Sequence, residues 1–278
     1  ANGVLNVASQ GQILGSELGR LHGEAIAQRV SGSADWRLDW REQAGLGDMR
    51  FEIALDDLRL KLPPPFDRID RPAAERLVLR TEQSRERFQL VSVDAGDVVR
   101  GKLALEHQNG WRLTRGHVGF GMNRVTLPAR AGLQVSARLD RLDVDQWLPL
   151  LGSGSGAPPP AVLRGISAEI KQLDMFDRPW GRVYMDLTPA GNGWQALLDG
   201  DNAVGRARYV PANAQQPASA KLDLSMLKLP EKKHRGTDTP IEPRRLPAVD
   251  LRTTVFEYKA RNVGEVDFSA APFEQGWR

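Results

Sequence analysis

The sequence of 278 residues contains no cysteine. This absence excludes a disulfide scaffold, thiol catalysis and metal sites built on cysteine ligands. Aromatic residues are scarce, at 6% of the chain. No stretch approaches the roughly 18 consecutive apolar residues that a membrane-spanning helix needs. Hydrophobic residues still make up 41%, so the composition is that of a folded protein rather than a disordered one.

The chain also lacks a strong excess of one charge. Its 38 Lys and Arg residues stand against 35 Asp and Glu residues, for a net charge of +3. The densest basic run, Lys232–Arg235 followed by Arg244 and Arg245, is interrupted by Thr, Pro and Glu. Proteins that bind nucleic acid usually concentrate their basic residues on one face or in one run. We therefore interpret this run as a solvated loop and expect no nucleic-acid partner.

Catalytic and metal-binding motifs are missing as well. The sequence has no Gly-x-Ser-x-Gly elbow, phosphate loop, dinucleotide fingerprint or HExxH helix. The serines in the Gly-Ser-Gly-Ser-Gly stretch at 152–156 precede three prolines, as expected of a linker. His107 and His117 flank one predicted hairpin, but a zinc site there would need a third ligand. We expect no catalytic residue, no metal and no cofactor, and hence a protein that is not an enzyme.

A Gly-Trp pair recurs at a fixed interval. The three tryptophans are evenly spaced (194 − 111 = 83 and 277 − 194 = 83). Because the pair returns at the same place, we predict structural turns in which the tryptophan packs across a hairpin. The pairs are Gly110-Trp111, Gly193-Trp194 and Gly276-Trp277.

Leucine-rich segments that end at a proline define the boundaries of larger repeats. They lie at 51–62, 135–148 and 221–229. We predict one continuous repeating β structure over 1–278 and interpret it as a fragment of a longer protein. Its approximate repeats are 1–66, 67–151, 161–230 and an incomplete 246–278, with linkers at 152–160 and 231–245.

The hydrophobic pattern has a period of two. Leu133, Val135, Ala137 and Leu139 alternate with polar residues, and 51–55 and 183–187 follow the same pattern. Such alternation is typical of a strand with one apolar and one polar face. The sequence therefore predicts an all-β fold: an elongated, curved antiparallel sheet with at most short helices.

Two three-residue steps interrupt the alternation. The next apolar residue after Leu55 is Leu58, and the next after Leu139 is Leu142. A β-bulge produces a phase break of this kind. The segment 142–151, with Asp143 as a possible cap, could also form a turn or two of helix.

Several of these segments together resemble the YhdP family, relatives of AsmA and TamB in Gram-negative bacteria. The resemblance is carried by Trp36, the stretch FEIALDDLRLKLPPPF at 51–66, LDRLDVDQWLPLL at 139–151 and the run at 246–270. It covers nearly the whole chain.

The resemblance implies a function in lipid transfer. Family members are similar to bridge-like lipid transfer proteins, whose sheet curls into a trough lined with apolar side chains. Their implied role is to carry phospholipids across the periplasm between the inner and outer membranes and to support the outer-membrane permeability barrier. The resemblance also implies an N-terminal helix that anchors family members in the inner membrane, and we interpret this chain as a piece without that anchor. The implied partners are phospholipid acyl chains and, through missing parts, components of both membranes.

Strand phase selects the side chains that would contact acyl chains, since apolar residues on one face of a sheet would line a trough. These predicted lipid-binding residues are Phe51, Ile53, Leu55, Leu103, Leu105, Leu133, Val135, Leu139, Val183, Met185, Leu187, Leu222, Leu224, Met226, Val266 and Phe268.

Other interpretations of the pattern remain open. The same alternating strands could close into a sandwich or barrel with a filled core, which is the commoner arrangement. The preference for an open trough rests chiefly on the resemblance. Two other functions also fit the sequence: a structural or scaffolding module of the cell envelope that binds no lipid, and a glycan-binding protein that uses Trp36, Trp111 and Trp194.

Overall fold

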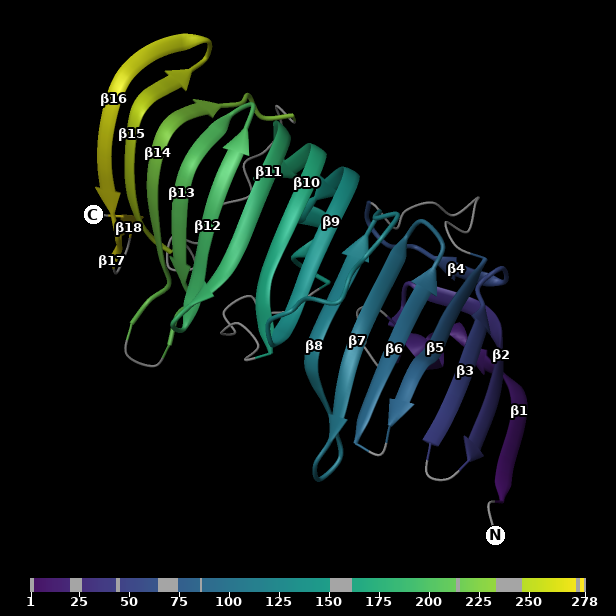
Figure 1. The fold of residues 1–278 in the computed structure, drawn as a ribbon. Coiled ribbons are helices and arrows are strands. Elements are labelled where there is room, and N and C mark those ends of the chain that lie inside the picture. The colour runs from purple at the N-terminus through teal and green to yellow at the C-terminus, as the bar shows by residue number, and fades with distance from the viewer. Residues whose placement is uncertain are drawn as a thin grey trace. The chain divides into compact units, whose positions relative to one another are not determined.

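The computed structural model describes a chain built almost entirely of β-strands (Figure 1). The described residues are 3–20, 27–43, 46–64, 75–85, 87–150, 162–213, 216–233, 247–273 and 276–277. The chain divides into two compact units: unit 1 comprises residues 1–138 and 162–164, and unit 2 comprises residues 139–161 and 165–278. The predicted linker at 152–160 and most of the one at 231–245 lie outside the described residues.

Unit 1 is a sheet in which neighbouring strands mostly follow chain order. In that order they are β1 (Val4–Leu14), β2 (Val30–Gln43), β3 (Leu46–Ala54), β5 (Arg76–Arg85), β6 (Phe88–Ala95), β7 (Val99–His107), β8 (Trp111–Phe120) and β9 (Gly132–Asp143), whose last residues belong to unit 2. The short strand β4 (Leu58–Leu60) also pairs with β2, and the helix α1 (Gly15–Arg20) follows β1.

Unit 2 continues with the same kind of sheet. After the short helix α3 (Val144–Trp147), its strands are β10 (Leu163–Met175), β11 (Arg178–Ala190), β12 (Gly193–Gly200), β13 (Ala203–Val210), β14 (Ser219–Leu229), β15 (Ala248–Tyr258) and β16 (Arg261–Ala270). Strands β17 (Pro272–Phe273) and β18 (Gly276–Trp277) pair with each other. The strand order from β1 to β16 is that of one sheet, which confirms the all-β prediction with short helices.

The sheet departs from the predicted antiparallel pairing in two places. Strands β8 and β9 run parallel, as do β14 and β15. A parallel pair needs a connection that returns to the starting end of the sheet. The connection between β8 and β9 crosses one face of the sheet at Gly119, where an added Cβ would lie 2.7 Å from Val125 Cγ1. His117 and Arg100 hold the same connection by contacts to the carbonyl oxygens of Thr126 and Asn123.

The register confirms the phase break after Leu55. Trp36 of β2 lies opposite Ile53 of β3. The same register would place Val30 opposite residue 59, but Val30 lies opposite Leu60 of β4. One extra residue therefore separates β3 from β4 along the same partner strand. The predicted short helix is present after Leu139: β9 ends at Asp143, and α3 follows it. The Asp143 carboxylate caps this helix by accepting a hydrogen bond from the Gln146 N–H at 3.1 Å.

The Gly-Trp pairs lie at strand starts, but the topology after them differs. Trp111 begins β8, whose next neighbour β9 is parallel, whereas Gly193 begins β12, whose next neighbour β13 is antiparallel. A Cβ on Gly193 would lie 2.2 Å from the Tyr209 carbonyl oxygen, so only glycine fits there. The 83-residue spacing thus describes the turns and not the strand arrangement after them. The division into four repeats stays a prediction.

The buried core is small for a chain of this length. Among the described residues of unit 2, one cluster of buried side chains consists of Ile170, Leu173 and Val183. Partly buried side chains pack on it from β9, α3, β10 and β11: Leu139, Leu142, Val144, Ala168, Trp180 and Met185. The chain exposes 18299 Å² of surface, against about 12000 Å² expected for a compact protein of its mass. A filled sandwich would bury far more of its apolar residues.

A carboxylate from the α3 segment holds the turn between β10 and β11. Phe176 and Asp177 have positive φ angles, and their N–H groups donate to the Asp145 carboxylate at 2.9 and 2.7 Å. Two charge-assisted hydrogen bonds to an otherwise strained turn stabilise it. We expect Asp145→Ala to lower the free energy of unfolding by about 2 kcal/mol in urea denaturation. Asp186→Ala, at an exposed strand position, should leave it within about 0.5 kcal/mol; an equal loss in both variants would contradict this role.

Candidate functional site

Unit 1 carries a continuous row of apolar residues across its strands. Residues that lie opposite each other in neighbouring strands share a face of the sheet. The strand registers therefore show which residues form one row across the sheet. This central row runs from β2 to β9 through Leu38, Phe51, Leu79, Val93, Gly101, Val118 and Val135. No charged residue interrupts it. We call the side of the sheet that carries this row the apolar face of unit 1.

Two flanking rows extend this face along the strands. One contains Trp36, Ile53 and Leu77, and the other contains Val91, Leu103, Gly116 and Leu133. An added Cβ at Gly116 would lie 2.9 Å from Leu103 Cδ2 and 3.1 Å from Leu133 Cδ1. Leucines from both neighbouring strands therefore close over the glycine, and the apolar surface is continuous across β8.

The opposite side of unit 1 is charged, and we call it the polar face of unit 1. One of its rows contains Arg37, Glu52, Val78, Asp94, Arg100, Gly119 and Ser136. Ion pairs join Arg50 to Glu52 and Lys102 to Glu82. A hydrogen bond from Arg37 to the Asp39 carboxylate raises the pKa of that exposed arginine. The two faces of one sheet are therefore chemically opposite.

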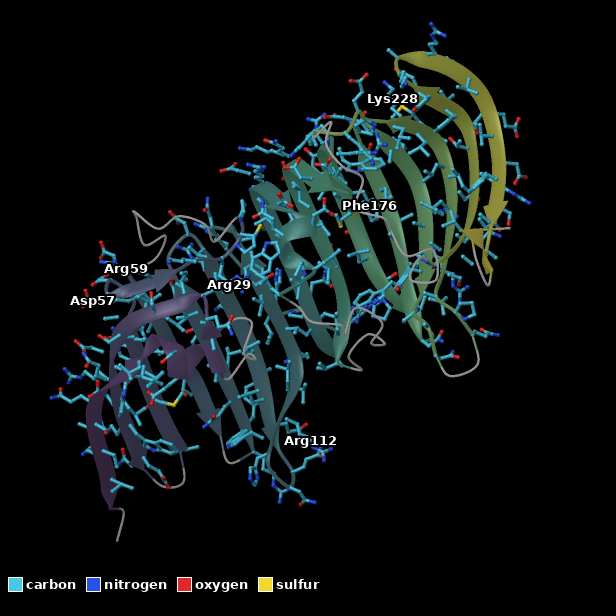
Figure 2. The ribbon with its side chains drawn as sticks, turned by 180° about the vertical axis from the view of Figure 1, so that it is seen from behind. Arg29, Asp57, Arg59, Arg112, Phe176 and Lys228 are labelled. Carbon is cyan, nitrogen blue, oxygen red and sulfur yellow. The ribbon has the colours of Figure 1, made fainter. Side chains whose placement is uncertain are left out.

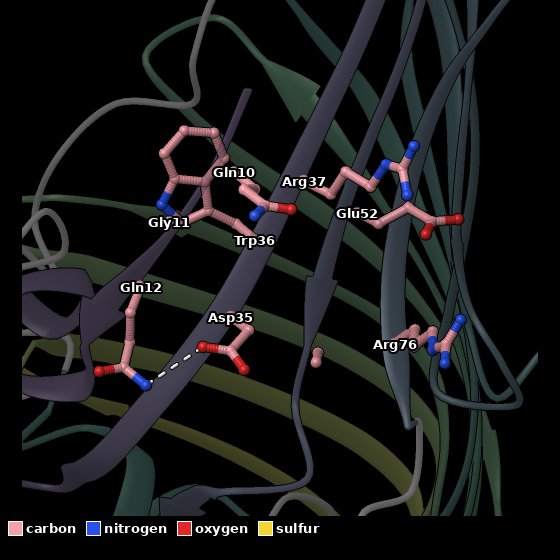
Figure 3. Close-up of a pocket in the computed structure, with 9 residues that line it drawn as sticks. Gln10, Gly11, Gln12, Asp35, Trp36, Arg37, Glu52 and Arg76 are labelled. Atoms are coloured by element: carbon pink, nitrogen blue, oxygen red, sulfur yellow. Dashed lines mark hydrogen bonds between the residues drawn. The ribbon is translucent and has the colours of Figure 1, made fainter. Parts of the chain in front are cut away.

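The described cavities of unit 1 are lined mainly by residues of the polar face. One of about 700 Å³ is lined by Gln10, Gln12, Asp35, Arg37, Glu52 and Arg76 among others (Figure 3). Gln12 donates a hydrogen bond to Asp35 there at 3.1 Å. A second cavity, of about 470 Å³, is lined by Asp39, Asp48, Arg50 and Arg80 among others. Val7, Trp40 and Met49 also line this second cavity, so it combines apolar with charged side chains.

Unit 2 has an apolar face of its own. Its longest row contains Ile166, Leu187, Ala196, Ala207, Leu222, Leu251 and Phe268. The next row contains Ala168, Met185, Leu198, Gly205, Leu224, Thr253 and Val266. Phe268 at the end of the longer row is 49% exposed. Among the described residues of unit 2, only Thr253 in these two rows has a polar side chain.

The polar face of unit 2 presents alternating charges. Arg206, Asp223, Arg252 and Asp267 lie opposite one another on four successive strands. Arg252 Nε is 3.2 Å from the Asp267 carboxylate. Opposite charges in cross-strand positions stabilise the pairing by a few tenths of a kcal/mol. Side chains project from both sides of the strands in Figure 2.

Most of the predicted lipid-binding residues lie on these apolar faces. In unit 1 they are Phe51, Ile53, Leu103, Leu105, Leu133 and Val135, and in unit 2 they are Met185, Leu187, Leu222, Leu224, Val266 and Phe268. Leu224 is only 3% exposed. Whether these residues contact lipid stays a prediction.

Four predicted residues lie outside the rows named above. Leu55 directly follows β3, and its N–H donates to the Glu75 carbonyl oxygen. Val183 is a buried member of the core of unit 2, and Leu139 packs on that core. Met226 lies beyond a register shift: Gly205 pairs with Leu224 and Val204 with Met226, so Ser225 is an extra residue against β13. Against β15 the register is unbroken, with Leu224 opposite Thr253 and Met226 opposite Val255.

Other residues of the apolar faces were missed in the sequence. They include Leu38, Leu79, Val91, Val93 and Val118 in unit 1 and Leu198 and Leu251 in unit 2. The alternation of Leu77 and Leu79 was a usable signal, but a register shift between Thr81 and Gln83 breaks the phase before the next strand. The composition of a face depends on the register between strands, whereas the sequence pattern shows only the alternation along one strand.

The described residues contain neither a metal site nor a membrane-spanning helix. No three His, Cys, Asp or Glu side chains among them come together in a way that could hold a metal ion. None of the described helices has the length and apolar character needed to cross a membrane.

The fold and its surfaces define a class of protein: a β-sheet with one apolar and one charged face and little core of its own. Comparison with known proteins gives the family. The model of the YhdP family, described as "YhdP protein", matches residues 1–278, and the chain belongs to this family. Membership suggests the AsmA-like lipid-transport group. No curated protein and no solved structure matches the chain.

Proposed function

We propose that this chain is a lipid-transfer segment whose apolar faces hold phospholipid acyl chains while the headgroups stay in water. Exposing hydrocarbon to water costs roughly 0.8 kcal/mol per CH₂ group, so a sixteen-carbon chain costs on the order of 12 kcal/mol. A continuous apolar surface removes most of this barrier. Such a carrier needs no catalytic residue.

The observation that carries the proposal is the central row of unit 1. It crosses seven strands without a charged residue, whereas the row beside it on the other face carries Arg37, Glu52 and Asp94. A protein of this size rarely leaves a large contiguous apolar surface without an apolar partner. Because successive strands continue the row, a guest molecule could move across the sheet without leaving hydrocarbon-like surroundings.

Family membership supports a periplasmic location for this function. We infer that the chain forms part of a longer protein anchored in the inner membrane, and that it acts in the periplasm. There it would carry phospholipids between the inner and outer membranes and support the outer-membrane permeability barrier. Each apolar face would line a trough that continues into neighbouring parts of that protein.

Two adjacent residues of β5 offer a direct test of lipid contact. Leu79 lies on the apolar face of unit 1, and Arg80 lies on the polar face. A photo-cross-linking amino acid at position 79 should form an adduct with phospholipid during expression in a Gram-negative bacterium, detected by mass spectrometry. The same amino acid at position 80 should give at least about tenfold less adduct, because acyl chains avoid a charged surface.

The test also separates the other functions. Equal labelling at both positions, or none at either, would rule out the apolar face as a lipid surface and leave a scaffolding module. A glycan-binding protein would instead be indicated by sugar adducts near the tryptophans. The Trp36 ring packs over Gly11, where an added Cβ would lie 2.9 Å from its Cζ2 atom. Trp36 lies on the same side of the sheet as Ile53, so it belongs to the apolar face.

A further inference from the structure

The apolar face of unit 1 ends in a polar and aromatic row at one end of its strands. Along β6, β7 and β8 the row of Val91, Leu103 and Gly116 is followed by Gln89, Leu105 and Leu113. The last row pairs His107 with Trp111. Arg87 borders it, because its carbonyl oxygen accepts a hydrogen bond from the His107 N–H at 3.0 Å. The surface thus changes from hydrocarbon to amphipathic to charged within three rows.

The side chains of this last row suit the boundary between hydrocarbon and water. Trp111 is 47% exposed, and the His107 ring meets its edge at 5.2 Å between ring centroids and 68° between planes. Indole rings favour such boundaries, because one part is apolar and the N–H needs a polar partner. Arg87 is exposed in the turn before β6, and a guanidinium binds phosphate oxygens through two parallel hydrogen bonds.

Charge distinguishes this end of the sheet from the other. Arg87 and Arg112 lie at the β5–β6 and β7–β8 hairpins of this end, and Arg130 precedes β9, which starts here because it runs parallel to β8. Figure 2 shows Arg112 on the β7–β8 hairpin. The turn between β6 and β7 at the other end instead carries Asp94 and Asp97, with Arg100 within 4.0 Å of each. Among the described residues, the β5–β6 and β7–β8 hairpins therefore favour an anionic group more than the β6–β7 turn does.

Unit 2 repeats the aromatic part of this arrangement. Trp194 of β12 lies opposite Tyr209 of β13 in the row that follows Ala196 and Ala207, at the β11–β12 hairpin end of its apolar face. In both units the apolar face therefore ends in a tryptophan just after a hairpin glycine.

We propose that Arg87, His107 and Trp111 form a headgroup site, in which a bound phospholipid lies along the strands with its phosphate at this row and its acyl chains toward Leu103. The inference rests on the proposed lipid-transfer function and adds an orientation to it. Strand β7 has nine residues and a length of roughly 27 Å, which exceeds the roughly 15 Å that one leaflet's hydrocarbon occupies. An acyl chain therefore fits along the strand with its polar end at His107.

Binding to two lipids that differ only in the headgroup tests this site. The purified chain would be titrated with phosphatidylglycerol and with diacylglycerol of the same acyl chains, each fluorescently labelled on one chain. Arg87→Glu should weaken binding of phosphatidylglycerol about tenfold and leave diacylglycerol unchanged, whereas Arg87→Lys should weaken phosphatidylglycerol binding only a few-fold. Trp111→Ala should weaken the binding of both lipids.

Arg112→Glu is the matched control. Arg112 is exposed on the same hairpin, but it lies opposite Glu106 on the polar face, so this variant should bind both lipids as the unchanged protein does. The headgroup site is refuted if Arg87→Glu weakens both lipids equally, or if Arg112→Glu weakens phosphatidylglycerol as much as Arg87→Glu does. Failure of the unchanged protein to bind either lipid would instead overturn the proposed function itself.

Discussion

Val93→Asp should reduce phospholipid transfer by the purified chain at least about tenfold. Val93 lies in the middle of the central row of unit 1, between Leu79 of β5 and Gly101 of β7. A carboxylate there must lose water whenever an acyl chain passes, which costs several kcal/mol, and each 1.4 kcal/mol is a factor of ten in rate or affinity. Transfer of a fluorescent phospholipid between donor and acceptor vesicles measures the effect.

Ser92→Asp provides the matched control for this prediction. Ser92 is the preceding residue on the polar face, where it lies opposite Arg80 and Lys102. A carboxylate between two basic side chains is favourable in a sheet, so this variant should fold and transfer lipid like the unchanged protein. If the two variants transfer lipid equally well while both keep their circular dichroism spectra, the apolar face is not the transfer path.

Gly121→Ala should destabilise unit 1 by about 2–4 kcal/mol and lower its melting temperature by on the order of 10 °C. Gly121 begins the connection to the parallel strand β9 with a φ of +63°, and its N–H donates to the Val98 carbonyl oxygen. An added Cβ would lie 2.1 Å from the Arg138 carbonyl oxygen, so the backbone of β9 must shift. Urea unfolding monitored by circular dichroism measures the loss.

Gly191→Ala separates the steric clash from the backbone strain. Gly191 has nearly the same φ, +66°, but nothing lies within 4 Å of the position of its Cβ. Only the left-handed backbone penalty then applies, and we expect a loss of about 1 kcal/mol. Equal losses in the two glycine variants would mean that Arg138 and the parallel junction do not restrict residue 121.

Much of the fold could be predicted from alternation along single strands. In β9, the alternation of Leu133 and Val135 with Gln134 and Ser136 predicts one apolar and one polar face. The step from Leu55 to Leu58 marks the extra residue between β3 and β4. These features depend on neighbours in sequence, which a period of two records directly. Asp143 as a helix cap is local in the same sense.

The site was harder to predict, because it depends on register between strands. Ser225 is an extra residue of β14 against β13 but not against β15, although the sequence alternates without interruption from Leu222 to Met226. Val183 continues the apolar phase of Met185 and Leu187, yet α3 and the end of β9 pack where it lies and bury it. A shift by one residue exchanges the faces of a strand, and only the partner strand shows it.

The amino-acid sequence by itself determined that the chain is made of two-faced strands with few helices, and it carried enough of the family's pattern to identify it. Alternation and turn residues act over a few positions, so they are legible without a structure. Only the tertiary structure decided which strands run parallel and which residues join into one apolar row from β2 to β9. Those properties arise from hydrogen bonds between segments far apart in the chain, whose register no single strand contains.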